Sequence, residues 1–276
     1  MTAWTTREVR AEQLDARSLV DGERLEAEVK AVYRHVARGD EAELHFELGR
    51  GLAERLGYPS ALLEAIPAEA LASFAGVGHH LDLAALKPGE AVLDLGSGSG
   101  TDVFCAALLV GASGHVTGVD ITEEQLDKAA RLRERHGFSQ VRFVEAHIEE
   151  LPFEDASFDA VISNGVINLS PAKGRVFAEA ARVLRPGGRL AIADIVSGRA
   201  LKERTRRNVE LWAACIAGAI PRHHYLEALG AHGLQIRRLR TNEYRFISQR
   251  ALDACSTYDV ESVSLVAAKP TEGGKR

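Results

Sequence analysis

Short apolar runs alternate with amphipathic stretches through the middle of the chain. The runs with the length and composition of buried strands are residues 91–95, 116–119, 141–144, 160–163 and 190–196. Helix-like stretches separate them, including residues 101–110 and a segment that opens at Thr122 and ends at His136. Strands that alternate with helices at this spacing predict an α/β fold with a doubly wound, mostly parallel sheet and helices on both faces.

Two of the predicted helices begin with local signals. Thr122 followed by Gln125 three residues later predicts a capping box. Ser170 followed by Pro171 predicts an N-cap and a proline in the first helical position. The second of these helices is expected to stop at the turn RPGG, residues 185–188.

The two ends of the chain show weaker patterns. Residues 11–36 and 41–56 predict helices with no strand signal between them, so we expect residues 1–75 to form a helical cap. Residues 209–220 and 225–229 predict helices, and residues 234–239 and 263–268 predict the last strands. A single α/β domain is expected over residues 76–270, followed by a disordered tail at 271–276.

Composition narrows the class of protein. The 34 basic and 39 acidic residues leave a net charge of -5, which argues against a nucleic-acid partner. No apolar run approaches the ~20 residues that cross a bilayer, and the polar N-terminus lacks a secretory signal. The 3 cysteines lack metal-binding spacing. We therefore expect a cytoplasmic protein with no membrane partner and no metal site.

Glycines crowd the junction between the first predicted strand and its helix, in the run DLGSGSG at residues 94–100. Glycines there permit a tight turn and let backbone N–H groups approach a ligand closely. Asp120 ends the second predicted strand, where an acid accepts hydrogen bonds from ribose hydroxyls. The pattern predicts a nucleoside-containing cofactor.

The nicotinamide dehydrogenases are the alternative class with such a loop. Their third glycine falls where this chain has Thr101. Asp94 beside the loop would repel a pyrophosphate but suits the ammonium of a methionine moiety. These two residues favour S-adenosylmethionine as the cofactor.

Several longer stretches then support a family resemblance: residues 94–100, 114–120, 162–171, 183–188 and 211–219. Together they resemble class I S-adenosylmethionine-dependent methyltransferases and, more narrowly, the arsenite methyltransferase family. The resemblance extends over about residues 57–235. The stretch NGVINLSP at residues 164–171 and the stretch WAACIAGA at residues 212–219 are its most specific parts.

The resemblance implies which residues contact the cofactor. Beside Asp94, the residues that would wrap the amino-acid and sulfonium end are Gly96, Ser97, Gly98 and Gly100. Asp120 would hold the ribose, and the adenine would lie against Ile121, His147 and Ile148. Asn164 would lie beside the methionine moiety.

The chain departs from the family at the positions that bind arsenic. Three cysteines usually hold trivalent arsenic, a soft ion that needs thiolate ligands. Here Val77 and Gly165 occupy two of those positions and only Cys215 remains, while Cys105 and Cys255 lie elsewhere. We therefore expect another small molecule as the methyl acceptor, with arsenite as the alternative substrate.

No residue pattern identifies a catalytic group. A general base, if one is needed, would come from His79, His80, His223 or His224, and Cys215 is a further candidate. The helical cap and the stretch from Ser197 to Pro221 are where acceptor specificity is expected. A cofactor-binding module without catalysis is the remaining alternative.

Overall fold

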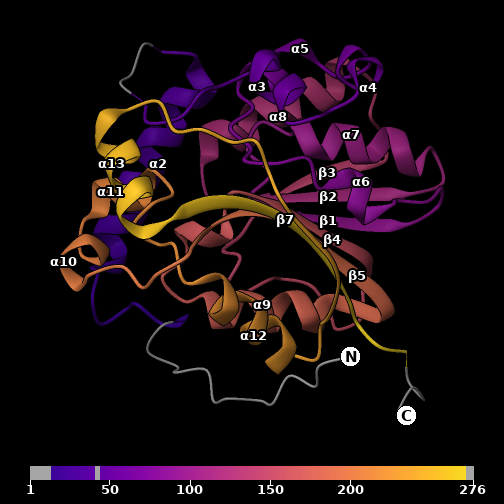
Figure 1. Ribbon diagram of the computed structural model, residues 1–276. Coiled ribbons are helices and arrows are strands. Elements are labelled where there is room, and N and C mark those ends of the chain that lie inside the picture. The colour runs from indigo at the N-terminus through magenta and orange to yellow at the C-terminus, as the bar shows by residue number, and fades with distance from the viewer. Residues whose placement is uncertain (1–13, 41–43, 272–276) are drawn as a thin grey trace.

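The computed structural model describes residues 14–40 and 44–271 (Figure 1). Its centre is a 7-stranded sheet in the order β3-β2-β1-β4-β5-β7-β6. The first five strands run parallel, and β7 is antiparallel to both of its neighbours. The strands are β1 (Ala91–Leu95), β2 (His115–Asp120), β3 (Val141–Glu145), β4 (Phe158–Asn164), β5 (Leu184–Ser197), β6 (Gln235–Thr241) and β7 (Val260–Ala268).

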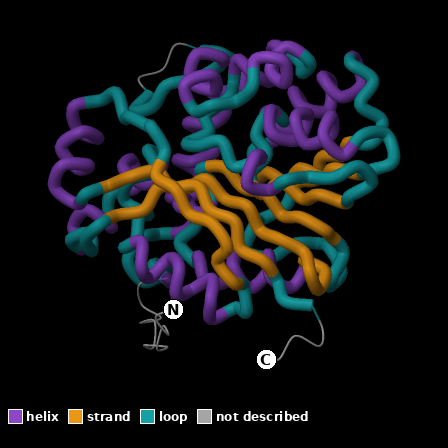
Figure 2. Tube along the Cα trace, turned by 45° about the vertical axis from the view of Figure 1, so that its right-hand side comes forward, coloured by secondary structure: helices purple, strands orange, loops and turns teal. Residues whose placement is uncertain are grey.

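Helices cover both faces of the sheet, as Figures 1 and 2 show. The helices along the chain are α2 (Gly22–Arg38), α3 (Arg50–Arg55), α4 (Ser60–Glu64), α5 (Ala68–Ala72), α6 (Leu81–Ala84), α7 (Thr101–Val110), α8 (Glu123–Arg135), α9 (Lys173–Val183), α10 (Glu203–Arg206), α11 (Val209–Ala213), α12 (Arg222–Ala231) and α13 (Gln249–Tyr258), with a 3₁₀ turn η1 (Ile167–Leu169). The doubly wound α/β prediction is confirmed.

Alternation of side chains along the strands divides the core into layers. Val92 packs on the face of the sheet that α4 to α8 cover. Its neighbour Leu93 packs on the opposite face, which α9 and α12 cover. A third apolar cluster joins α2, α11 and α13 at one end of the sheet. Burial of both sheet faces explains why the parallel strands are continuous apolar runs.

The predicted N-terminal helices were too long. The first is interrupted, because Leu14 is helical but residues 15–21 are not. Helix α2 begins at Gly22, where the side chain of Asp21 caps it by accepting from the Arg24 N–H at 3.2 Å. The second is confined to α3, since Gly49 is left-handed (φ 84°) and donates to the Phe74 carbonyl at 2.8 Å instead. Residues 11–13 and 41–43 of these predicted helices lie outside the described ranges.

The two predicted helix caps have different outcomes. Thr122 is the N-cap residue of α8, as predicted, but the capping box does not form: its side chain makes no capping bond, and the Gln125 amide donates to the Tyr33 carbonyl at 2.9 Å. Helix α9 begins at Lys173 after an N-cap at Ala172, and Ser170 accepts from the Ala172 N–H at 3.0 Å. Tertiary contacts outcompete the local caps at both places.

The C-terminal third differs most from its prediction. The expected helix over residues 209–220 ends at Ala213, and Cys215 adopts a left-handed φ of 60°. Helix α13 has no counterpart in the sequence prediction, although Ser248 caps it by accepting from the Ala251 N–H at 3.2 Å. The two last strands are confirmed as β6 and β7.

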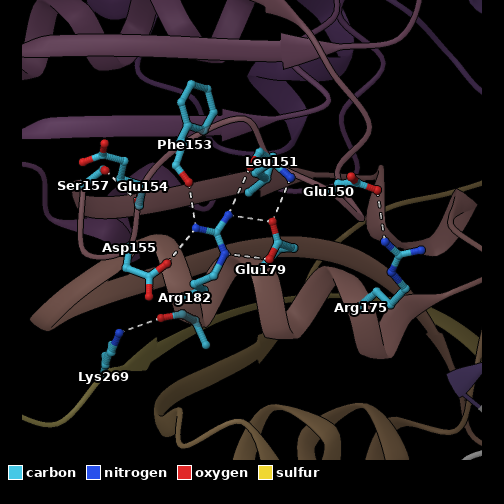
Figure 3. A network of polar contacts seen from close by, with 11 residues as sticks. Glu150, Leu151, Phe153, Glu154, Asp155, Ser157, Arg175, Glu179, Arg182 and Lys269 are labelled. Carbon is cyan, nitrogen blue, oxygen red and sulfur yellow. Dashed lines mark hydrogen bonds and ion pairs between the residues drawn. The ribbon is translucent and has the colours of Figure 1, made fainter.

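An arginine ties α9 to the segment that follows β3 (Figure 3). Arg182 donates to the carbonyls of Leu151 at 3.1 Å and Phe153 at 2.7 Å, and it pairs with Glu179 at 2.7 Å. Glu179 in turn accepts from the Leu151 N–H at 2.8 Å. These bonds fix the chain just after residues 147–149, which belong to the cavity described below.

Within the described ranges, no helix combines the length and the apolar character needed to span a membrane. The cytoplasmic location and the division at residue 75 stay predictions. The predicted tail lies outside the described residues, apart from Thr271.

Candidate functional site

A cavity of about 460 Å³ opens beside the carboxyl ends of β1, β2 and β4. This is the edge at which open α/β sheets bind ligands, and the volume lies in the range of small-molecule sites. Helix α2 forms one wall through Leu25, Val29 and Tyr33. The segment 73–76 and Leu169 of η1 contribute to the remaining boundary.

The predicted cofactor residues gather around this cavity. All of them except Gly100 line it: Asp94, Gly96, Ser97, Gly98, Asp120, Ile121, His147, Ile148 and Asn164. Gly100 is required for packing instead, because a Cβ there would lie 2.9 Å from the rings of Phe104 and Phe143. Cofactor contact by the lining residues stays a prediction, which the geometry now makes specific.

The glycine loop has the backbone shape that only glycine adopts readily. Gly96 and Gly98 have φ values of 69° and 52°. A side chain at Gly96 would also collide with Val166. The hydroxyl of Ser97 is buried and makes no hydrogen bond within the described part of the chain. Because buried polar groups are normally hydrogen-bonded, this hydroxyl is available to a ligand.

Asp120 closes the loop from the end of β2. Its carboxylate accepts from the Gly98 N–H at 2.9 Å and from the Thr122 N–H at 2.8 Å. Burial raises the pKa of Asp120, although these hydrogen bonds oppose the shift. The carboxylate retains lone pairs on the cavity side for further donors.

Asp94 lies deeper, with 2% of its surface exposed. Burial raises its pKa well above the usual range, and the charges of Asp102 and Asp120 raise it further. No described Lys, Arg or His side chain forms an ion pair with Asp94 or Asp102. A cavity with unpaired buried carboxylates favours a cationic ligand.

His147 and Ile148, the residues predicted to contact adenine, are held by two sets of contacts. Ile148 is buried, and the His147 ring lies 4.0 Å from the Glu26 carboxylate of α2. The arginine network of Figure 3 anchors the same segment from behind. Sequence reasoning did not identify the α2 wall, because a helix pattern does not show which cavity a helix faces.

None of the catalytic candidates lines the cavity. His80 is fully buried without a hydrogen bond to either ring nitrogen in the described chain, and burial lowers its pKa. His223 lies on α12, with its ring centroid 4.0 Å from that of His224. A catalytic role for His80, His223 or Cys215 stays a prediction without support from position.

The three positions discussed for arsenic do meet in space. A Cβ at Gly165 would lie 3.4 Å from Val77, and the Cys215 thiol donates to the Gly165 carbonyl at 3.5 Å. Burial, and then the charge of Asp194, raises the pKa of Cys215 to about 12. One protonated thiol therefore stands where three thiolates would be needed.

Sequence comparisons relate the chain to methyltransferases. A family model described as a methyltransferase domain matches residues 86–251. The arsenite methyltransferase of Halobacterium salinarum is 43% identical over 167 residues, which are 60% of this chain and 42% of that protein. The human arsenite methyltransferase is 43% identical over 138 residues, 47% of this chain and 37% of that protein. The matched part thus spans less than half of these relatives.

Solved structures show the same likeness. An arsenic(III) S-adenosylmethionine methyltransferase from Chlamydomonas reinhardtii aligns with a TM-score of 0.62 and 32% identity, covering 83% of this chain and 76% of that one. A geranyl diphosphate methyltransferase in complex with S-adenosylmethionine has a TM-score of 0.58 at 20% identity, covering 82% and 98% of the two chains. The second likeness concerns the fold alone.

Proposed function

Since this chain belongs to the S-adenosylmethionine-dependent methyltransferases, in the arsenite methyltransferase-like family, we propose that it transfers a methyl group from S-adenosylmethionine to a small-molecule acceptor other than trivalent arsenic. The observation that carries this proposal is the cavity at the strand ends. It joins the glycine loop, Asp94 and Asp120 in one space. Gly165 also lines this space, and Val77 and Cys215 lie beside Gly165 without lining it.

The residues present fit S-adenosylmethionine. Asp120 offers lone pairs to ribose hydroxyls. Asp94 offers a buried carboxyl to the cationic end, and a bound cation would oppose the burial that raises the Asp94 pKa. The unpartnered Ser97 hydroxyl lies in the loop between them. Ile121 and Ile148 supply apolar surface for the adenine ring.

When bound, S-adenosylmethionine would supply an activated methyl group, whose carbon bonds to the acceptor atom as the C–S bond breaks and S-adenosylhomocysteine leaves as a neutral thioether. The chain's own contribution is to align the reactants and exclude water. Leu25, Val29 and Tyr33 shield the cavity with helix α2. Burial raises the pKa of Tyr33 well above its usual range, so its hydroxyl can donate a hydrogen bond to an acceptor but does not take a proton at neutral pH.

The proposal extends to the organisation of the chain. Residues 1–75 serve as a helical cap and residues 76–270 as the methyltransferase domain, since α2 contributes a wall to the cavity without belonging to the sheet layers. Acceptor specificity then resides where the cap meets the segment after β5. The proposed partner is a small molecule.

Calorimetry tests cofactor binding on the full chain. We expect S-adenosylhomocysteine to bind and NAD not to bind, because Asp94 repels a pyrophosphate. Tight NAD binding with no response to S-adenosylhomocysteine would refute the proposal. A panel of small nucleophiles with methyl-labelled cofactor then separates catalysis from binding without turnover, the alternative function.

The arsenic alternative needs its own assay. We expect negligible methylation of trivalent arsenic with a phosphine reductant, since a single protonated thiol lacks the ligands that a soft ion requires. A parallel reaction with glutathione controls for thiols supplied from solution. The double variant Val77→Cys with Gly165→Cys is the positive control, although position 165 has a φ of 77° that disfavours a side chain. Robust methylarsenic production by the unaltered chain without added thiol would establish the alternative.

A further inference from the structure

A tyrosine from the helical cap bonds to an acid that lines the cavity. Tyr58 follows α3, and its hydroxyl donates to the Asp102 carboxylate at 2.5 Å. Asn164, at the end of β4, donates to the same carboxylate at 3.0 Å and to the Tyr58 oxygen at 3.1 Å. Three segments that are distant in sequence thus meet on one acid that lines the cavity.

Both polar atoms of the Asn164 side-chain amide form hydrogen bonds within the protein. Its oxygen accepts from the Val77 N–H at 2.8 Å, and its nitrogen also donates to the Gly78 carbonyl at 3.0 Å. A Cβ at Gly76 would lie 2.5 Å from that nitrogen, so this segment packs directly on the amide. Asn164 lines the cavity as predicted, but its polar atoms serve Asp102 and the neighbouring backbone.

Asp102 and Asp94 lack a cationic partner in the described chain. Both are buried, with 6% and 2% of their surfaces exposed, and both line the cavity. His79 and His80 are nearby, but burial lowers the pKa of each, so both are neutral at neutral pH. Two buried carboxylates without a cation are costly unless a ligand supplies the positive charge.

A structural explanation accounts for only part of this arrangement. Asp102 lies in the first turn of α7, where the helix dipole favours an acid. The dipole does not require two buried donors directed at the carboxylate from Tyr58 and Asn164. Those donors fix the orientation of Asp102, which is what ligand recognition needs.

We propose that Tyr58 and Asn164 position Asp102, so that Asp102 acts together with Asp94 to bind the ammonium group at the amino-acid end of the cofactor. This inference rests on the proposed function. Asp102 is a binding residue in this account, and Tyr58 is a positioning residue contributed by the helical cap. Cofactor recognition therefore depends on residues 1–75 as well as on the sheet.

Comparing the affinities of two ligands distinguishes the proposed positioning role from a general loss of stability. S-adenosylhomocysteine carries the amino-acid end, and 5′-methylthioadenosine has the same nucleoside and thioether without it. By calorimetry, Asp102→Asn should weaken S-adenosylhomocysteine about 10- to 100-fold, the effect of losing a hydrogen bond to a charged group. Tyr58→Phe should weaken it about 3- to 30-fold. Both variants should bind 5′-methylthioadenosine within about twofold of the unaltered chain.

Tyr225→Phe is the matched control. The Tyr225 hydroxyl also donates to a buried carboxylate, Asp194, at 2.9 Å, but neither residue lines the cavity. This variant should leave the affinity ratio of the two ligands unchanged.

The outcomes distinguish the inference from the function it rests on. An equal loss for both ligands, or no loss for S-adenosylhomocysteine, in Tyr58→Phe and Asp102→Asn would overturn the positioning role. If Asp102→Asn does not fold, the ratio of the affinities for S-adenosylhomocysteine and 5′-methylthioadenosine in Tyr58→Phe tests the positioning role by itself. Failure of the unaltered chain to bind either ligand would instead refute the proposed cofactor.

Discussion

Asp120 shows how one carboxylate both shapes a loop and lines the cavity. Two of its lone pairs are satisfied by the Gly98 and Thr122 N–H groups, which hold the glycine turn against the end of β2. The others remain available on the cavity side. The residue therefore has a structural role that its position at a strand end did not reveal.

Asp120→Ala should weaken S-adenosylhomocysteine binding by about 1–3 kcal/mol, because it removes charge-assisted hydrogen bonds to the ribose. Calorimetry with the purified variant measures this loss. Asp159→Ala is the control, since Asp159 accepts from the Ala91 N–H at 2.9 Å near the opposite ends of β1 and β4. An unchanged dissociation constant for Asp120→Ala would show that the carboxylate serves the loop alone.

The cysteines illustrate how burial removes reactivity. Burial raises the pKa of Cys215 to about 12, of Cys255 to about 11 and of Cys105 well above its usual range. A raised thiol pKa leaves little of the nucleophilic thiolate near neutrality. The same shift removes the soft ligand that trivalent arsenic would need from Cys215.

We expect Cys105 and Cys215 to resist a disulfide reagent at pH 8 in the native protein, with Cys255 reacting slowly. All 3 cysteines should react rapidly after unfolding in guanidinium. Mass spectrometry of the labelled peptides assigns the order. Rapid native labelling of Cys215 would mean that its thiolate is accessible, and would strengthen the arsenic alternative.

At the scale of elements, the contact between α9 and the loop after β3 supports the segment 147–149, which lines the cavity. Arg182 bonds to two backbone carbonyls and two carboxylates there, including Asp155 at 2.9 Å (Figure 3). Arg175 lies on the same helix, and among the described residues its ion pair is with Glu150, at 3.3 Å, where both side chains are exposed. Arg182 therefore bonds to the backbone of the loop, whereas Arg175 forms an exposed ion pair.

Arg182→Met should lower the free energy of unfolding by about 1–3 kcal/mol, since it leaves half-buried carbonyls and Glu179 without their donor. Urea denaturation measures the change. Arg175→Met should change it by less than about 0.5 kcal/mol, as exposed ion pairs do. Equal effects of the two substitutions would contradict this assignment.

At the scale of the whole molecule, helix α2 forms part of the cavity wall together with the strand ends of the sheet. Leu25, Val29 and Tyr33 line it, and the helix packs against α8 and α11. A ligand in the cavity adds contacts to α2 that the free protein lacks. Ligand binding should therefore suppress local opening of this helix.

S-adenosylhomocysteine at saturating concentration should slow tryptic cleavage within α2, at Arg24, Lys30 or Arg34. Cleavage in α10, which does not line the cavity, should be unaffected and provides the internal control. Mass spectrometry of the digestion time course gives both rates. Equal rates for α2 with and without ligand would argue against α2 as a wall of the binding site.

Much of this protein was determined by local sequence. The strand β1 and helix α7 were predicted with their observed bounds, and the family resemblance was confirmed. The glycine run and Asp120 were predicted to share one site, and both line the cavity. These features follow from short-range patterns, because a strand, a tight turn and a helix are encoded by neighbouring residues.

Only the tertiary structure decided which distant residues meet. Tyr58, Asp102 and Asn164 come from separate segments, and nothing in their spacing predicts their hydrogen bonds. Gln125 and Ser170 had sequence signals for helix caps, yet longer-range partners took their side chains. Hydrogen bonds across the fold are set by how helices pack on the sheet, and local preferences of a few tenths to about 1 kcal/mol yield to that packing.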